Sequence, residues 1–108
     1  MSSTIFALSS GTGPAGIAVI RASGPGVESI CQTLNLGNLQ PRRAHLVRPI
    51  DPLSREPIDT AVALRFPRPH SYTGEDMLEL HVHGGRAVVA AMLAALSRIA
   101  SKGVMIRD

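Results

Sequence analysis

The sequence contains little cysteine and few aromatic residues. Its 108 residues include one cysteine, one tyrosine, two phenylalanines and no tryptophan. A single cysteine excludes an internal disulfide and suits a reducing compartment such as the cytosol. We interpret this residue, Cys31, as a small buried side chain on a helix rather than as a reactive thiol. With so few rings the core has to be aliphatic, and a hydrophobic content of 44% is enough to build it.

Long apolar runs are also missing. No stretch approaches the ~20 apolar residues that a membrane-spanning helix needs, and no signal peptide is visible at the N-terminus. The motif G-x-x-x-x-G-K-S/T occurs nowhere in the sequence. Because a P-loop requires that motif, this chain by itself is excluded from the P-loop nucleotidases. We also expect no membrane partner.

Positive charge exceeds negative charge by a small margin. The chain has 11 Lys and Arg residues against 8 Asp and Glu residues, a net charge of +3. Such an excess is compatible with a nucleic-acid partner. However, the basic residues are scattered, only Arg42 and Arg43 are adjacent, and aromatic residues do not alternate with them as on a single-strand platform. An RNA-binding module therefore stays an alternative.

The hydrophobic pattern predicts six strands and two helices. Strands are predicted over residues 4–9, 17–23, 44–50, 58–66, 77–83 and 104–106, and helices over residues 27–36 and 85–102. The third and fourth strands are expected to form a hairpin. This order predicts an α+β fold, a mixed sheet with two helices on one face. The chain ends as a strand begins, so we expect a single domain, residues 1–108, that is part of a longer protein.

The glycine-rich segment Gly11 to Gly16 (GTGPAG) matches G-x-G-x-x-G after a predicted strand. A dinucleotide site would need a helix to begin at the third glycine, where its N-terminus faces the pyrophosphate. Here a β-branched strand, IAVIRAS, follows, and Pro14 interrupts the motif. We therefore interpret the segment as a flexible connection between two strands.

Three polar residues, Glu79, His81 and His83, alternate along the predicted strand 77–83 and share one of its faces. A carboxylate and two imidazoles are zinc ligands. Consecutive residues on one strand splay apart, however, so a zinc site is one of three alternatives. The others are a solvated polar face and a ligand pocket in which Glu79 is the main hydrogen-bond acceptor.

Two further features point to a ligand. The sequence His83-Gly84-Gly85-Arg86 begins the second helix, where it would either offer free N–H groups to an anion or form a tight turn with positive φ. Arg21 lies among apolar residues of the second strand. If Arg21 and Glu79 share a face of adjacent strands, Glu79 could accept two N–H donors from a guanidine-like ring edge, and Arg21 could hold a carbonyl or carboxylate. A reduced pterin with a glutamate tail offers that combination.

These residues together resemble a known family. The segments 17–25 (IAVIRASGP) and 71–76 (SYTGED), with Phe66-Pro67, Glu79 and His83-Gly84-Gly85, are similar to the N-terminal domain of the tRNA modification GTPase MnmE, also called TrmE. The resemblance runs from Thr4 to the end of the chain. It implies the folate-binding fold of glycine-cleavage T-proteins, a homodimer, and a bound 5-formyltetrahydrofolate or related reduced folate.

The resemblance also implies roles for single residues. Arg21 and Glu79 match the arginine and glutamate that contact the folate in the family. Gly84 and Gly85 would let the backbone approach the ligand. No catalytic residue and no metal ligand is expected in this chain.

For the whole protein, the resemblance implies a cytoplasmic GTPase that acts with its partner MnmG on the wobble uridine of certain tRNAs. The folate would donate a one-carbon unit, and potassium and magnesium would serve the GTPase. The GTPase and helical domains are absent from this chain, which should hydrolyse no GTP alone. The alternative is a purely structural dimerisation domain without affinity for a ligand.

Overall fold

The computed structural model describes residues 4–9, 16–100 and 106–107. It contains six strands and two helices. These are β1 (Thr4–Leu8), β2 (Ile17–Ser23), α1 (Val27–Thr33), β3 (His45–Val47), β4 (Ala61–Phe66), β5 (Met77–His83), α2 (Arg86–Ala100) and β6 (Ile106–Arg107). The strands form one sheet in the order β3-β4-β5-β2-β1-β6.

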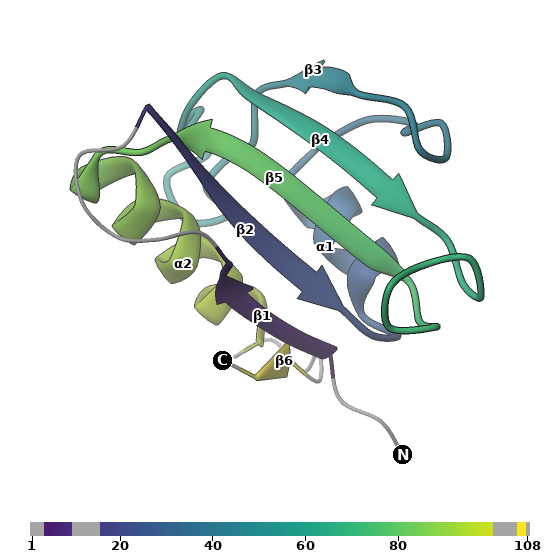
Figure 1. Cartoon of the computed structure of the whole chain (residues 1–108). Helices are drawn as coiled ribbons and strands as arrows, with labels where there is room; N and C mark the ends of the chain where they lie inside the picture. The colour runs from purple at the N-terminus through teal and green to yellow at the C-terminus, as the bar shows by residue number, and fades with distance from the viewer. Residues whose placement is uncertain (1–3, 10–15, 101–105, 108) are drawn as a thin grey trace.

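The sheet is mixed, and both helices lie against the same face of it (Figure 1). Neighbouring strands are antiparallel, except that β6 pairs parallel to β1. The α+β prediction is therefore confirmed, as is the antiparallel pairing of β3 with β4. β2 and β5 lie at the centre of the sheet although α1, β3 and β4 separate them in sequence.

Two element boundaries differ from the predictions for identifiable reasons. Helix α1 ends at Thr33, three residues early, because Asn35 adopts a left-handed φ of 58° that stops the helix. Strand β4 begins at Ala61 rather than at residue 58. The side chain of Asp59 accepts the backbone N–H of His83, which replaces a backbone pairing at that end of the sheet.

The core lies between the sheet and the helices and is mainly aliphatic, as predicted, with Phe6 as its one aromatic residue among those described. Alternate residues of β2 and β5 point into it and meet one face of each helix. The buried residues include Ala18, Ile20, Ala22, Leu78, Leu80 and Val82 from the strands and Ile30, Met92, Leu96 and Ile99 from the helices. Cys31 belongs to this cluster, and burial raises the pKa of its thiol to about 11. The prediction that Cys31 is buried on a helix is confirmed; that its thiol is unreactive stays a prediction, which the raised pKa supports.

Among the residues that the structure describes, no helix lies over the opposite face of the sheet (Figure 1). We call it the open face; its central polar residues are Arg21, Glu79 and His81. Apolar side chains surround them, including Ile5, Ile17, Leu46, Val62, Leu64 and Phe66, as the strand registers place them. Ile17 and Leu46 are 60% and 77% exposed. An exposed apolar surface of this kind is typical of an interaction site.

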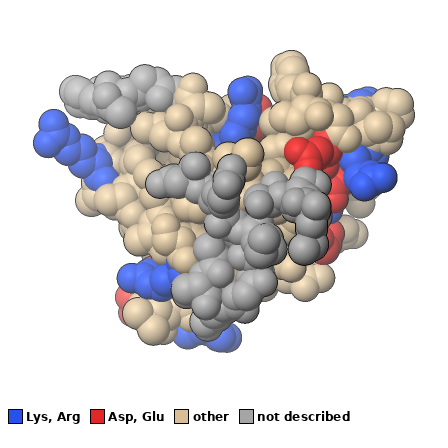
Figure 2. All heavy atoms as spheres, turned by 90° about the horizontal axis from the view of Figure 1, so that it is seen from below, with Lys and Arg blue, Asp and Glu red and all other residues tan. Residues whose placement is uncertain are grey.

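Basic side chains do not gather into one patch on the face that Figure 2 shows, where they stand apart from one another. Several arginines are engaged within the chain, since Arg21, Arg65 and Arg98 each form an ion pair with an acidic side chain. In the part of the chain that the structure describes, neither helix is both long enough and apolar enough to cross a membrane.

Candidate functional site

The centre of the open face is a cross-strand pair. Arg21 of β2 stands directly opposite Glu79 of β5, and the Arg21 Nε donates to Glu79 Oε2 at 2.7 Å. Glu79 is 7% exposed and is the one charged residue among those described that is buried. The condition set in the sequence analysis, that Arg21 and Glu79 share one face of adjacent strands, is met.

A histidine completes the environment of the carboxylate. His81 Nε2 lies 3.1 Å from Glu79 Oε1, so each oxygen accepts one hydrogen bond within the chain. Burial tends to raise the pKa of Glu79, but the hydrogen bonds from His81 and Arg21 outweigh it and hold the pKa below its ordinary value. Glu79 is therefore ionised at neutral pH. Because a carboxylate offers about four lone-pair sites, about two remain for further donors.

Tyr72 forms a wall beside this pair. Its ring lies under the guanidinium of Arg21, with 5.4 Å from Arg21 Cζ to the ring centroid. The centroid of the ring is also 6.4 Å from that of Phe66, and Tyr72 is itself 82% exposed. Sequence analysis did not select Tyr72 as a site residue. The signal was its position inside the SYTGED segment as the only tyrosine of the chain.

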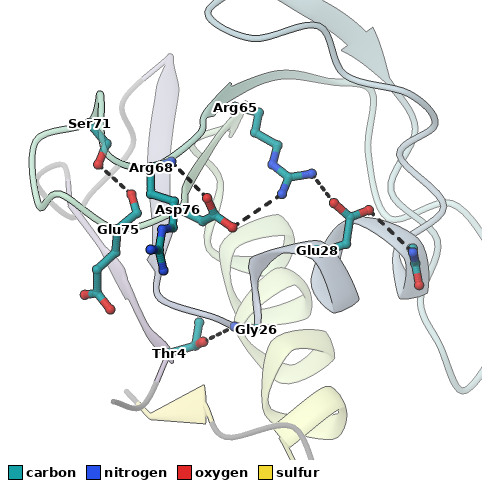
Figure 3. Close-up of polar contacts among 9 residues, drawn as sticks. Thr4, Gly26, Glu28, Arg65, Arg68, Ser71, Glu75 and Asp76 are labelled. Atoms are coloured by element: carbon teal, nitrogen blue, oxygen red, sulfur yellow. Dashed lines mark hydrogen bonds and ion pairs between the residues drawn. The ribbon is translucent and has the colours of Figure 1, made fainter. Parts of the chain in front are cut away.

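The loop 67–76 that carries Tyr72 is fixed to the rest of the fold (Figure 3). Asp76 is the main anchor. Its side chain accepts the backbone N–H of Arg68 at 2.9 Å and pairs with Arg65 of β4, and its carbonyl accepts the N–H of Gly24 at 2.9 Å. Gly74 adopts a φ of 78°, a conformation that favours glycine. These contacts hold the loop in a defined position beside the Arg21–Glu79 pair.

The loop is also tied directly to β2. Ser23 Oγ and Thr73 Oγ1 are 2.7 Å apart, and Ser71 Oγ donates to the carbonyl of Glu75 (Figure 3). These contacts involve three residues of the segment 71–76 and one of the segment 17–25, the two segments that carried the family resemblance. The side chains of these segments therefore shape the loop, and the ring of Tyr72 is exposed on its surface.

The two glycines of the predicted site lie elsewhere. Gly84 and Gly85 follow the far end of β5, roughly 15–20 Å from Glu79 at the usual rise of a strand. The positive-φ alternative is wrong, because the glycines with positive φ among the described residues are Gly24, Gly37 and Gly74. The N–H of Gly84 donates to the carbonyl of Gly16 at 3.3 Å and is not free for an anion. A ligand contact at Gly84 or Gly85 stays a prediction.

The zinc alternative gains no support from the geometry. His83 Nδ1 contacts Asp59 Oδ1 at 2.8 Å instead of turning toward Glu79. Among the residues that the structure describes, no three His, Cys, Asp or Glu side chains lie close enough to hold a metal ion. The dinucleotide alternative also lacks its helix, since Gly16 leads into strand β2; residues 11–15 of that motif lie outside the described residues.

Asp59 predicts a measurable pH dependence. Burial tends to raise the pKa of Asp59, but hydrogen bonds from the backbone and side chain of His83 outweigh it and hold the pKa below its ordinary value of 3.8. A carboxyl group with a lowered pKa stabilises the fold above its unfolded pKa, and this stabilisation is lost as the pH falls through the folded value. Between pH 6 and pH 3, urea unfolding should therefore show a larger loss of stability for wild type than for Asp59→Asn. Parallel losses in the two proteins would contradict this assignment.

The sequence of this chain matches one family model and is similar to known proteins of that family. Residues 4–105 match the family model described as GTP-binding protein TrmE N-terminus. The chain is 52% identical over 99 residues to the tRNA modification GTPase MnmE of Novosphingobium aromaticivorans, covering 92% of this chain and 23% of that protein. It is 50% identical over 97 residues to MnmE of Parvibaculum lavamentivorans, covering 89% of this chain and 22% of that protein.

A human protein is equally similar. The chain is 52% identical over 98 residues to the mitochondrial 5-taurinomethyluridine-tRNA synthase subunit GTPB3 of Homo sapiens, covering 89% of this chain and 20% of that protein. The chain thus spans about a fifth of the length of the relatives it matches. It belongs to the family of the GTP-binding protein TrmE N-terminus.

Proposed function

We propose that this chain is a module that binds a reduced folate, 5-formyltetrahydrofolate or a close relative, and that forms a homodimer. The observation that carries the proposal is the buried, ionised carboxylate of Glu79 on the open face, paired with Arg21 beside the ring of Tyr72. A buried carboxylate with a perturbed pKa on an accessible face is typical of a binding site.

The residues present fit a pterin. The edge of a reduced pterin carries two neighbouring N–H donor groups, and Glu79 has about two lone-pair sites left to receive them. Arg21 uses its Nε within the chain, so its terminal N–H groups can reach an acceptor on the ligand. The exposed ring of Tyr72 offers an apolar surface to a flat ligand. When bound, the folate would supply a one-carbon unit to the reaction of the whole protein.

The rest of the proposal concerns the whole protein. The relatives named above modify tRNA, so we propose that this module serves a cytoplasmic GTPase acting with MnmG on the wobble uridine of tRNA. Binding of GTP, potassium and magnesium belongs to the GTPase part, since this chain carries no P-loop motif. For the homodimer, the exposed apolar residues Ile5, Ile17 and Leu46 of the open face are candidate contacts.

Calorimetric titration of 5-formyltetrahydrofolate into the chain, together with light scattering, tests the proposal. We expect saturable binding and a mass of two chains. A folded dimer that releases no heat and does not respond to the folate would contradict folate binding. It would favour the alternative of a purely structural dimerisation domain.

A further inference from the structure

A cavity lies on the helical side of the sheet, away from the open face. It has a volume of about 450 Å³ and is lined by Gln32, Thr33, Asn35, Ile50, Pro52 and Arg55. The first three of these residues come from the end of α1 and the turn directly after it, and the other three from the segment 50–55 that follows β3. We call this cavity the α1 pocket. Its size is within the range of small-molecule sites.

The segment 50–55 is held against both helices. Ile50 N donates to the carbonyl of Leu34 at the end of α1 at 2.9 Å, and Arg98 of α2 donates to Asp51 Oδ2 at 2.8 Å. Both helices lie against the sheet face that is opposite to the open face (Figure 1). The sheet therefore separates the α1 pocket from the folate site proposed above, and a ligand of this pocket would be a different molecule.

The charge of the α1 pocket comes from Arg55. Within the described part of the chain no hydrogen bond or ion pair engages its guanidinium, and no acidic side chain lines the pocket. The nearest acidic residues in sequence, Asp51 and Glu56, line a separate cavity beside α2. An anionic ligand would therefore meet an unpaired positive charge.

The turn around Arg55 fixes its position. The backbone of Arg55 has a φ of 65°, which is uncommon for arginine. The Arg55 N–H donates to the carbonyl of Asp51 at 2.8 Å, and Asp51 Oδ1 accepts the N–H groups of Leu53 and Ser54 at 2.8 and 3.2 Å. A conformation that the surroundings impose against residue type is found most often at functional positions.

The other polar groups of the pocket are neutral. The side chains of Thr33 and Asn35 are exposed and have no hydrogen-bond partner among the described residues. Gln32 Nε2 donates to Glu28 Oε1 at 3.4 Å, which leaves the amide oxygen of Gln32 as an acceptor. Hydroxyl and amide groups both donate and accept hydrogen bonds, which suits the hydroxyls of a sugar. The two remaining lining residues are aliphatic, so the described pocket offers no ring on which a base could stack.

We propose that the α1 pocket binds a phosphorylated sugar, either a free sugar phosphate or the sugar–phosphate unit of a nucleotide. Arg55 pairs with the phosphate, because the N–H donors of a guanidinium match the geometry of phosphate oxygens. The neutral polar groups at the end of α1 contact the sugar hydroxyls. Since no aromatic ring is present, a nucleotide would be recognised by its sugar and phosphate and not by its base.

An NMR titration of the isotope-labelled chain with ribose 5-phosphate, ribose and inorganic phosphate tests the proposal. Ribose 5-phosphate should shift the amide signals of residues 32–35 and 50–55, and each of the two fragments should bind more weakly, ribose by about tenfold. Arg55→Asn removes the charge and introduces a residue that adopts positive φ readily. It should weaken ribose 5-phosphate about tenfold, while its stability to urea stays at or above that of wild type.

Two further variants sharpen the test. Arg42→Asn is the matched control, because Arg42 also has a positive φ, of 60°, and does not line the α1 pocket. It should bind ribose 5-phosphate like wild type. Thr33→Val keeps the shape of the side chain and removes its hydroxyl. It should weaken ribose 5-phosphate roughly threefold and leave inorganic phosphate unchanged.

The proposal is overturned if ribose 5-phosphate shifts no signals of the pocket in folded wild type, or if Arg55→Asn binds it as wild type does. It is also overturned if inorganic phosphate binds as tightly as ribose 5-phosphate, because the sugar would then make no contact. A single-stranded RNA oligonucleotide separates the two sources of the ligand. Weaker RNA binding by Arg55→Asn would assign the pocket to a nucleotide of RNA, and unchanged RNA binding with weaker ribose 5-phosphate would assign it to a free sugar phosphate.

Discussion

Glutamine in place of Glu79 is expected to lower the affinity of the chain for 5-formyltetrahydrofolate by about thirtyfold or more. An ionised carboxylate only accepts hydrogen bonds, whereas an amide presents one oxygen and an NH₂ group that would face other donors. The variant would remove the negative charge that pairs with Arg21, and its NH₂ group would oppose the N–H groups of the pterin. Removing one partner of a desolvated charge pair costs about 2–5 kcal/mol, which corresponds to at least ~30-fold in affinity.

The control for this prediction is Glu56→Gln, the same change at an exposed carboxylate distant in the fold. It should bind the folate like wild type. Calorimetric titration measures both affinities, and circular dichroism shows whether the sheet is intact. Unchanged affinity in a folded Glu79→Gln protein would place the ligand away from the centre of the open face.

Alternation along strands made the faces of the sheet predictable. In β2 and β5, residues two apart share a face, so the buried residues Ala18, Ile20, Leu78 and Leu80 and the open-face residues Arg21 and Glu79 could be separated by counting. That β2 and β5 are neighbours was only a condition of the sequence interpretation. A whole strand–strand hairpin and a helix intervene in the chain, and pairing across them depends on the complete fold.

Loop contacts were not predictable in the same way. Tyr72 meets Arg21, and Arg42 meets His70, because separate segments converge in space, and no local periodicity encodes that. Positive φ was one of two alternatives at Gly84 and Gly85, and it is not found there. Among the described residues other than glycine it is found at Asn35, Arg42 and Arg55. Asparagine adopts this conformation readily, whereas the two arginines do so against their residue type.

Arg65 links the site loop to the helical side of the sheet (Figure 3). It points away from the open face, donates from Nη1 to Glu28 of α1 and lies 3.6 Å from Asp76 Oδ2 through Nη2. Its side chain is 18% exposed, and its Nε is buried without a hydrogen-bond partner. Burial alone would lower the pKa of Arg65, but the carboxylates of Glu28 and Asp76 raise it, so the residue stays charged.

Methionine in place of Arg65 is therefore expected to lower the free energy of unfolding by about 2 kcal/mol. Breaking a fully buried ion pair typically costs about 3–5 kcal/mol. The loss here is expected to be smaller because Glu28 is largely exposed. The aliphatic part of the side chain is kept, so the loss comes mainly from the unpaired Asp76 and Glu28. Urea unfolding measures it, with Arg48→Met, the same change at an exposed arginine, expected within about 0.5 kcal/mol of wild type.

The same variant should loosen the loop 67–76, because Asp76 is the residue that fixes its end. Tyr72 is the only tyrosine in a chain without tryptophan, so its fluorescence anisotropy reports on this loop alone. The anisotropy should fall in Arg65→Met and not in Arg48→Met, measured in native buffer where both are folded. A loss of stability with unchanged anisotropy would mean that Arg65 supports the packing of α1 but does not position the wall beside Arg21 and Glu79.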